Sequence, residues 1–389
     1  MKKYEIEFLK DVLLCSLGAY GGPEAHYGVY TDQLVIKKKY LTEEELLELI
    51  ALTGILPGPS STQTIIAIGY KVGGPVLGFL TLLVWALPVI SIMILLSFSS
   101  TFFEKTGISN DILKYIGPMA VGFILLAAWR LGKKVIQDKV TAFLFFFGGG
   151  ITYLYRQPWV FPLVLLAGGL VKIITSKKRK LWAPVIVKPP WKYLILFIGF
   201  FLGSVLIGMI TKNTLIELFQ RFYQYGFLVI GGGQVLIPYI FSDIVENQGY
   251  LSSQEFLTGF GLVQGLPGPM FSFSAYVGGM ASRDGSPLYQ IVGGLLSGLG
   301  IFLPGVLLIY FVYPIWEELK KIPGIKVALG GITAVAGGLI TTAAILLMRE
   351  SGCNIIHFLI TIGTVLLLKT KKIPAPGIVF LVLVLGYIL

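Results

Sequence analysis

The sequence predicts an all-α polytopic membrane protein made of two homologous halves, and three observations lead to this fold class. First, 55% of the 389 residues are apolar, only 13% are charged and the mean hydropathy is +0.82. A soluble domain carries about 25% charged residues, so this composition is typical of a membrane protein. Second, apolar stretches recur along the chain, and no soluble segment between them is long enough to be a catalytic domain. Third, one set of short motifs occurs twice.

The duplicated motifs keep a constant spacing of 210 residues. The pairs are Gly21 and Gly231, Tyr40 and Tyr250, Glu45 and Glu255, Pro57 and Pro267, and Gly69 and Gly279. Several landmarks at one offset indicate an internal duplication, which is common in transporter folds. We therefore predict an N-terminal repeat over 1–175, a basic, proline-rich linker over 176–192, and a C-terminal repeat over 193–389. The span at 193–210 has no counterpart in the first repeat.

Broken helices open the first repeat. The stretches 5–20 and 24–36 are each shorter than the roughly 20 residues that span a bilayer, and Gly21-Gly22-Pro23 between them cannot continue a helix smoothly. A helix begins after Thr42, with Glu45 completing a capping box, and ends at Pro57-Gly58-Pro59. A second short helix is expected over 60–70. Full spans follow at 75–103, 116–131, 140–155 and 158–174.

The second repeat shows the same order of elements. A helix at 215–229 precedes Gly231-Gly232-Gly233, a short helix follows at 234–245, and the helix at 252–266 leads into Pro267-Gly268-Pro269. A short helix is expected at 270–280, followed by spans at 290–312, 325–347, 353–368 and 374–389. Pro304 corresponds to Pro88 after a six-residue insertion. Together the two repeats predict about 10–12 membrane helical elements, several of them broken or re-entrant.

Much of the net charge of +11 is concentrated in clusters between the apolar runs, at 37–39, 130–139, 172–192, 320–326 and 369–372. Such clusters are typical of cytoplasmic loops, so we expect a lipid bilayer as the partner and no nucleic acid. Counting spans gives both halves the same orientation, but this would place the clusters at 320–326 and 369–372 outside. Inverted repeats would satisfy those clusters, and we favour them.

The breaks predict an anion site. A broken helix inside a membrane leaves backbone groups without partners unless they line a cavity or a ligand, and helix N-termini present N–H donors and partial positive charge. Two such ends, beginning near Gly58 and Gly268 and facing each other at mid-membrane, could bind an anion without a buried lysine. Tight turns outside the membrane, and close packing by small residues, are the structural alternatives. The candidate substrate-binding residues are Gly21, Gly22, Pro23, His26, Pro57, Gly58, Pro59, Ser60, Ser61, Gln63, Gly231, Gly232, Gly233, Gln234, Pro267, Gly268, Pro269 and Ser272.

Asp11, Glu24 and His26 are candidates for proton coupling, since ionisable residues in apolar segments commonly relay protons; interfacial side chains are the alternative. Cys15 and Cys353 give no disulfide framework and no metal-ligand spacing, so no metal or cofactor is expected. Nucleotide-binding, zinc-protease and C-x-x-C motifs are absent from the sequence, which argues against an enzyme.

The motif set resembles the chromate transporter family in its long, two-domain form. The residues that carry the resemblance are Gly21-Gly22-Pro23 with His26, Tyr40-Leu41-Thr42 with Glu45, Pro57-Gly58-Pro59 with Gly69-Tyr70, Gly231-Gly232-Gly233, and Pro267-Gly268-Pro269 with Gly278-Gly279. Tyr20 departs from the family, which usually has phenylalanine before the first GGP. The resemblance implies a multi-pass protein of the prokaryotic inner membrane that moves chromate, and related members are associated with sulfate.

From these observations we expect a secondary transporter that exports chromate, driven by the membrane potential or a proton gradient. The substrate would lie between the two repeats at the broken-helix ends. Uptake of sulfate or another inorganic anion, and a passive anion channel, are the alternatives. An integral-membrane enzyme using His26 with Asp11 or Glu24 is a remote one. A homodimer is left open by the sequence.

Overall fold

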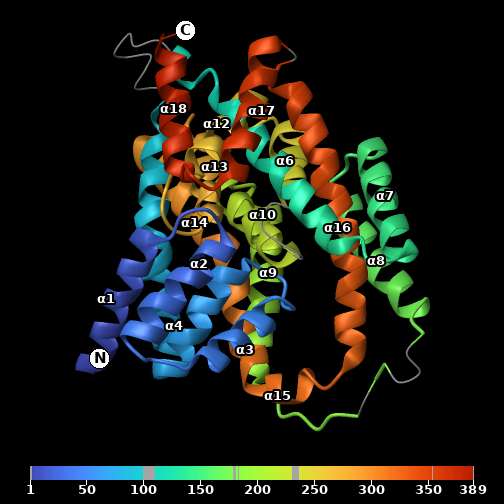
Figure 1. The fold of residues 1–389 in the computed structure, drawn as a ribbon. Helices are drawn as coiled ribbons and strands as arrows, with labels where there is room; N and C mark the ends of the chain where they lie inside the picture. The colour runs from blue at the N-terminus through green and yellow to red at the C-terminus, as the bar shows by residue number, and fades with distance from the viewer. Residues whose placement is uncertain are drawn as a thin grey trace. The chain divides into compact units, whose positions relative to one another are not determined.

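The computed structural model describes residues 2–99, 110–177, 181–182, 184–229, 236–352 and 354–388, and within these ranges it contains helices and no strands. Five of the described helices are long and apolar enough to cross a membrane, namely Ser60–Ser97, Asp111–Val135, Trp191–Thr211, Pro287–Leu319 and Pro323–Glu350. The prediction of an all-α polytopic protein is therefore confirmed (Figure 1).

The chain forms two compact units, each of which contains segments from both sequence halves. The first unit comprises Met1–Ile108, Lys188–Phe227 and Val263–Trp316, and the second comprises Ser109–Val187, Leu228–Leu262 and Glu317–Leu389. The predicted boundaries at 175 and 193 describe sequence repeats, which are a different level of organisation from these units.

The first unit contains the elements that carry most of the predicted site. They are α1 (Lys3–Gly18), α2 (Pro23–Tyr30), the π-helix η1 (Thr31–Lys37), α3 (Glu43–Thr53), α4 (Ser60–Ser97), α9 (Trp191–Thr211), α10 (Thr214–Leu228), η5 (Met270–Ser272), α13 (Phe273–Ala281), α14 (Pro287–Val312) and η6 (Tyr313–Ile315). The predicted capping box is present, because Thr42 Oγ1 accepts from the Glu45 amide and Glu45 Oε2 accepts from the Thr42 amide.

Helix α4 is a hairpin rather than one straight rod. Its backbone leaves helical geometry at Gly73 and Gly74, and Gly74 has φ +77°, a conformation that favours glycine. The arms 60–72 and 75–97 then pack against each other. Gly69 lies against Thr81 so closely that a Cβ would overlap it, and Trp85 Nε1 donates to Thr62 Oγ1 over 3.2 Å. The beginning of the short first arm therefore lies beside the middle of the long second arm.

The long arm of α4 packs antiparallel to its counterpart in the second repeat, α14. Ile90 contacts Gly298, and further along the arm Ile94 contacts Gly294. At the other end of the arm, Tyr310 Oη donates to the carbonyl of Pro75. Because the arm with Pro88 and the helix with Pro304 are equivalent in sequence, their opposite directions are those of inverted repeats.

The second unit is built around α16. Its elements are η2 (Asn110–Leu113), α6 (Ile116–Val135), α7 (Lys139–Leu154), α8 (Val160–Ile174), α11 (Ile237–Phe241), the π-helix η4 (Ser242–Asn247), α12 (Ser253–Val263), α15 (Trp316–Leu319), α16 (Pro323–Glu350), α17 (Ile355–Thr370) and α18 (Ala375–Ile388). Helices α7 and α8 lie along α16 (Figure 1). Small residues permit this approach, since a Cβ at Gly338 would overlap the Phe145 carbonyl and one at Gly331 the Gly168 carbonyl.

Basic clusters of the second unit come together. The ammonium groups of Lys133 on α6 and Lys369 on α17 both lie over the Trp129 ring, 4.3 and 5.3 Å from its centroid. Lys172 forms an ion pair with Asp138 at the start of α7. The clusters at 130–139 and 369–372, which a parallel arrangement of the halves would separate, therefore lie at one end of this unit, as the positive-inside rule requires.

Candidate functional site

The first proline corner joins α3 to α4. Gly58 has φ +133° and is buried between Pro57 and Pro59, and α4 begins at Ser60. The side chain of Gln63, one turn into α4, folds back so that Nε2 donates to the Pro57 carbonyl over 2.8 Å. A Cβ at Gly58 would overlap this carboxamide, so only glycine fits here without displacing Gln63.

The second proline corner precedes η5 and α13. Gly268 is buried, has φ +97°, and its amide donates to the carbonyl of Ala19 at the end of α1 over 2.8 Å. A Cβ placed on Gly268 would lie 3.3 Å from Val89 and 3.4 Å from the hydroxyl of Ser16. The corner is therefore held between the end of α1 and the long arm of α4.

Both corners lie at the level of the two helix-interior prolines. The bond between Trp85 and Thr62 places the first corner beside the Pro88 region of the long arm. The second corner touches Val89, the residue after Pro88. Gln63 in turn lies against Gly305, the residue after Pro304, where an added Cβ would stand 3.3 Å from the carboxamide. The structure thus places both corners beside the middle of the long arm of α4, and the first corner also beside Gly305 of α14. Gly58 and Gly268 are buried, whereas Pro57 and Pro267 are partly exposed.

Hydrogen-bond donors and one unpaired acceptor lie at these corners. In a helix that begins at Ser60, the amides of Ser60, Ser61 and Thr62 have no carbonyl partner within the helix. At the second corner the hydroxyl of Ser272 is fully buried and has no hydrogen-bond partner among the described residues, and the same is true of Gln63 Oε1 at the first. Each such group costs about 1–3 kcal/mol when left unpaired, so both corners favour a polar ligand or water.

His26 reaches the first corner from the GGP break. Gly21 and Gly22 have φ +88° and +91°, and Pro23 then begins α2. His26 is 2% exposed, and its Nδ1 lies 2.9 Å from the hydroxyl of Ser61. The GGP element therefore supplies a titratable group directly to the first turn of α4.

Trp85 and Tyr30 enclose this histidine. The Trp85 ring meets the His26 ring edge to face at 5.2 Å. Tyr30 Oη donates to the Ser61 carbonyl over 3.1 Å. Both side chains are fully buried, so they exclude water from one side of the His26–Ser61 pair.

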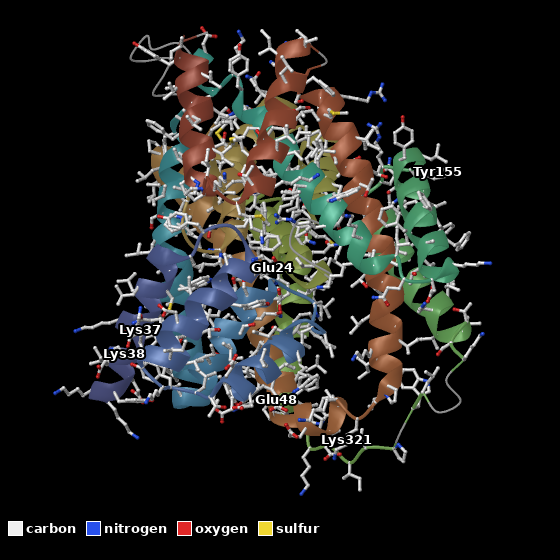
Figure 2. The ribbon with its side chains drawn as sticks, in the orientation of Figure 1. Glu24, Lys37, Lys38, Glu48, Tyr155 and Lys321 are labelled. Atoms are coloured by element: carbon white, nitrogen blue, oxygen red, sulfur yellow. The ribbon has the colours of Figure 1, made fainter. Side chains whose placement is uncertain are left out.

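Asp11 and Glu24, the other proton-coupling candidates, lie in different surroundings. Asp11 is 3% exposed, accepts from Gln33 Nε2 and Tyr40 Oη at 2.8 Å each, and pairs with Lys38 at 3.4 Å. These contacts tie α1 to η1 and the following loop. Glu24 is exposed on α2 (Figure 2). The contacts of Asp11 therefore lead away from the proline corners, and His26 is the candidate that reaches one.

Some predicted residues lie outside the part of the chain that the structure describes, and some residues at the site were not predicted. Gly231, Gly232, Gly233 and Gln234 lie outside the described residues. Sequence reasoning missed Trp85, Ser16 and Gly305. Trp85 and Gly305 flank Pro88 and Pro304, whose correspondence across the repeats was the signal that could have found them. Among the described residues no group of three or more histidine, cysteine or acidic side chains could hold a metal ion.

A helical membrane protein with inverted repeats and interrupted helices has an architecture that recurs among transporters. The profile of the chromate transporter family matches residues 6–173 and 216–388, one region in each half. The chain belongs to this family, which is a family of transporters and not of enzymes.

Two relatives resemble the chain over most of its length, and a shorter one resembles part of it. The probable chromate transport protein of Synechococcus elongatus is 26% identical over 99% of this chain and 96% of its own. The chromate transport protein of Cupriavidus metallidurans is 26% identical over 92% of this chain and 87% of its own. An uncharacterized transporter of Bacillus subtilis is 26% identical over 42% of this chain, yet over 87% of its own length. No solved structure matches significantly.

Proposed function

We propose that this protein is a secondary transporter of the inner membrane that exports chromate. The family and the names of full-length relatives support chromate as the substrate. The observation that carries the proposal is that two proline corners, each centred on a buried glycine, lie beside the same stretch of the long arm of α4, around Trp85 and Val89.

The anion would bind between the two corners. The amides at the beginning of α4 would donate to one side of a tetrahedral dianion, and the Met270 and Phe271 amides with the Ser272 hydroxyl to the other, since the Ser272 amide already donates to the Pro269 carbonyl. The Gln63 carboxamide would rotate from the Pro57 carbonyl towards the ligand. Neutral donors and helix ends would compensate a charge of −2 without a buried lysine, and alternating access would come from rocking of the repeats.

The membrane potential would favour export. Moving one elementary charge across 100 mV is worth about 2.3 kcal/mol, so a dianion leaving an inside-negative cell gains about twice this amount if it moves without a cation. A proton carried with the dianion would halve that gain. Uptake of the same ion would need coupled cations.

The test is chromate flux in proteoliposomes under an imposed potential, comparing the wild type with Gly58→Ala and Gly268→Ala. Gly199→Ala is the matched control, because Gly199 on α9 has open space around its Cβ position. We expect flux to fall in both corner variants and to persist in the control. Undiminished flux in correctly folded corner variants would refute the proposed site.

Sulfate is a tetrahedral dianion of the same charge, and the same assay tests it as a competitor. If chromate flux is small and sulfate inhibits it strongly, sulfate is the physiological substrate. A channel would give flux that does not saturate with anion concentration. Such flux would respond to the gradient and the potential only as flow through an open pore does.

A further inference from the structure

The contact between His26 and Ser61 joins a titratable ring to a donor of the proposed anion site. The two atoms, Nδ1 and Oγ, lie 2.9 Å apart, and both side chains are at least nine-tenths buried. Ser61 is the second residue of α4, where the amide nitrogens are free of helical partners. Its hydroxyl has a single hydrogen, so it can donate either to the histidine or to a bound anion.

The protonation state of His26 decides between these two donations. In the neutral ring with the proton on Nε2, Nδ1 is an acceptor, and the Ser61 hydroxyl donates to it. In the protonated ring both nitrogens are donors, so Nδ1–H donates to Ser61 Oγ and the hydroxyl hydrogen is released.

We propose that His26 and Ser61 form a proton-coupled anion switch, in which protonation of His26 turns the Ser61 hydroxyl towards the bound oxyanion. This inference rests on the proposed anion site and adds a proton as the co-transported ion. Because linkage is reciprocal, the anion raises the affinity of His26 for a proton by the same factor by which the proton raises the affinity for the anion.

Charged groups on the elements around α2 are engaged elsewhere or exposed. On α1, Asp11 is held by Lys38, Gln33 and Tyr40, and on η1, Asp32 pairs with Lys37. On α4, Lys71 pairs with Glu45, and on α2 itself Glu24 is exposed. Further titratable neighbours are Tyr30, which donates to the Ser61 carbonyl, Tyr27 on α2, whose ring lies 6.3 Å from that of Tyr30, and the buried Cys15 on α1. A bound dianion is therefore the natural counter-charge of a protonated His26.

The second corner lacks this pair. The residue 210 positions after His26 is Leu236, and the residue 210 positions after Ser61 is Phe271. The duplication thus supplies two corners but a single histidine–serine pair. One proton would accompany each dianion, and the dianion and its proton would cross together with a net charge of −1.

The experiment measures sulfate binding to the purified protein by calorimetry between about pH 5.5 and pH 8, the range in which histidine changes its charge. Sulfate is the probe because it stays a dianion over this range, whereas chromate itself takes up a proton. We expect the wild-type affinity to rise as the pH falls, with a limit of tenfold per pH unit for one proton. His26→Gln should bind with an affinity that does not depend on pH.

Two further variants separate the switch from a structural role. His357→Gln replaces the other histidine of the chain, which lies at the start of α17, and should keep the wild-type pH profile. Ser61→Ala should bind more weakly and show a smaller pH slope, because the hydroxyl that transmits the protonation is gone. Thermal unfolding of each variant confirms that it is folded.

The outcomes distinguish failure of the switch from failure of the site. Sulfate binding that is tight but independent of pH in the wild type, or a His26→Gln slope equal to that of the wild type, would overturn the switch and leave the proposed site standing. Absence of binding by both sulfate and chromate at every pH would overturn the corner site, and the switch with it.

Discussion

Replacement of Gly58 by alanine tests directly how the first corner is packed. With φ +133°, an L-residue at this position costs about 1–3 kcal/mol of backbone strain. The new Cβ also overlaps the Gln63 carboxamide, which must leave the Pro57 carbonyl and lose a partly buried hydrogen bond, for about another 1–3 kcal/mol. We expect Gly58→Ala to lower the free energy of unfolding by about 2–6 kcal/mol.

The second corner provides the comparison. Gly268 has φ +97°, so the backbone strain is similar, but the atoms nearest to a new Cβ lie at 3.3 and 3.4 Å and need to move only slightly. Gly268→Ala should therefore cost about 1–3 kcal/mol, less than Gly58→Ala. Denaturant titration in mixed micelles measures both values.

A double-mutant cycle isolates the overlap with Gln63. In a Gln63→Ala background the carboxamide is absent, and Gly58→Ala should cost only its backbone strain, which gives a coupling energy of about 1–3 kcal/mol between the two positions. Costs that add to within about 0.5 kcal/mol would refute the packing of Gln63 against Gly58.

Three other substitutions test the scaffold. Gly338→Val on α16 should destabilise the protein by about 1–3 kcal/mol or more, because the new side chain meets the Phe145 backbone. Thermal unfolding measures this, and an unchanged melting temperature would contradict the close packing of α16 against α7. Asp138→Ala should cost about 1 kcal/mol at neutral pH through loss of the α7 N-cap. Hydrogen bonds from Lys172 and the Thr141 amide lower the pKa of Asp138 from 3.8 to about 2. The stability that the Asp138 carboxylate contributes is therefore complete above pH 3.8 and is lost as the pH falls through 2. A stability difference between the wild type and Asp138→Ala that grows on acidification would contradict this. Gly74→Ala should cost about 1–2 kcal/mol because φ is +77° at the turn of α4, and denaturant titration showing no loss would argue against the hairpin.

The sequence was sufficient for the features that depend on local chemistry and on the duplication. Thr42 and Glu45 form a capping box wherever a helix begins there, and Pro57-Gly58-Pro59 must interrupt a helix. The offset of 210 residues then gave the second corner, and the family profile matches the two halves separately.

Features that depend on tertiary packing were beyond the sequence. Nothing in the apolar pattern shows that Gln63 lies between Gly58 and Gly305, because helices from both repeats must first come together. The π-helical turns at Thr31–Lys37 and Ser242–Asn247 occupy equivalent positions, but their hydrophobic period is too close to that of an α-helix to be distinguished. The two compact units exchange segments between the repeats, which chain order conceals.

The most direct measurement of the central claim uses selenate, a tetrahedral dianion whose selenium gives an anomalous signal in diffraction. Crystals of the wild type grown with selenate should show one peak between the two corners, within hydrogen-bonding distance of the amides at the beginning of α4 and of the Ser272 hydroxyl. A peak elsewhere in the protein, with no density between Gly58 and Gly268, would contradict the account.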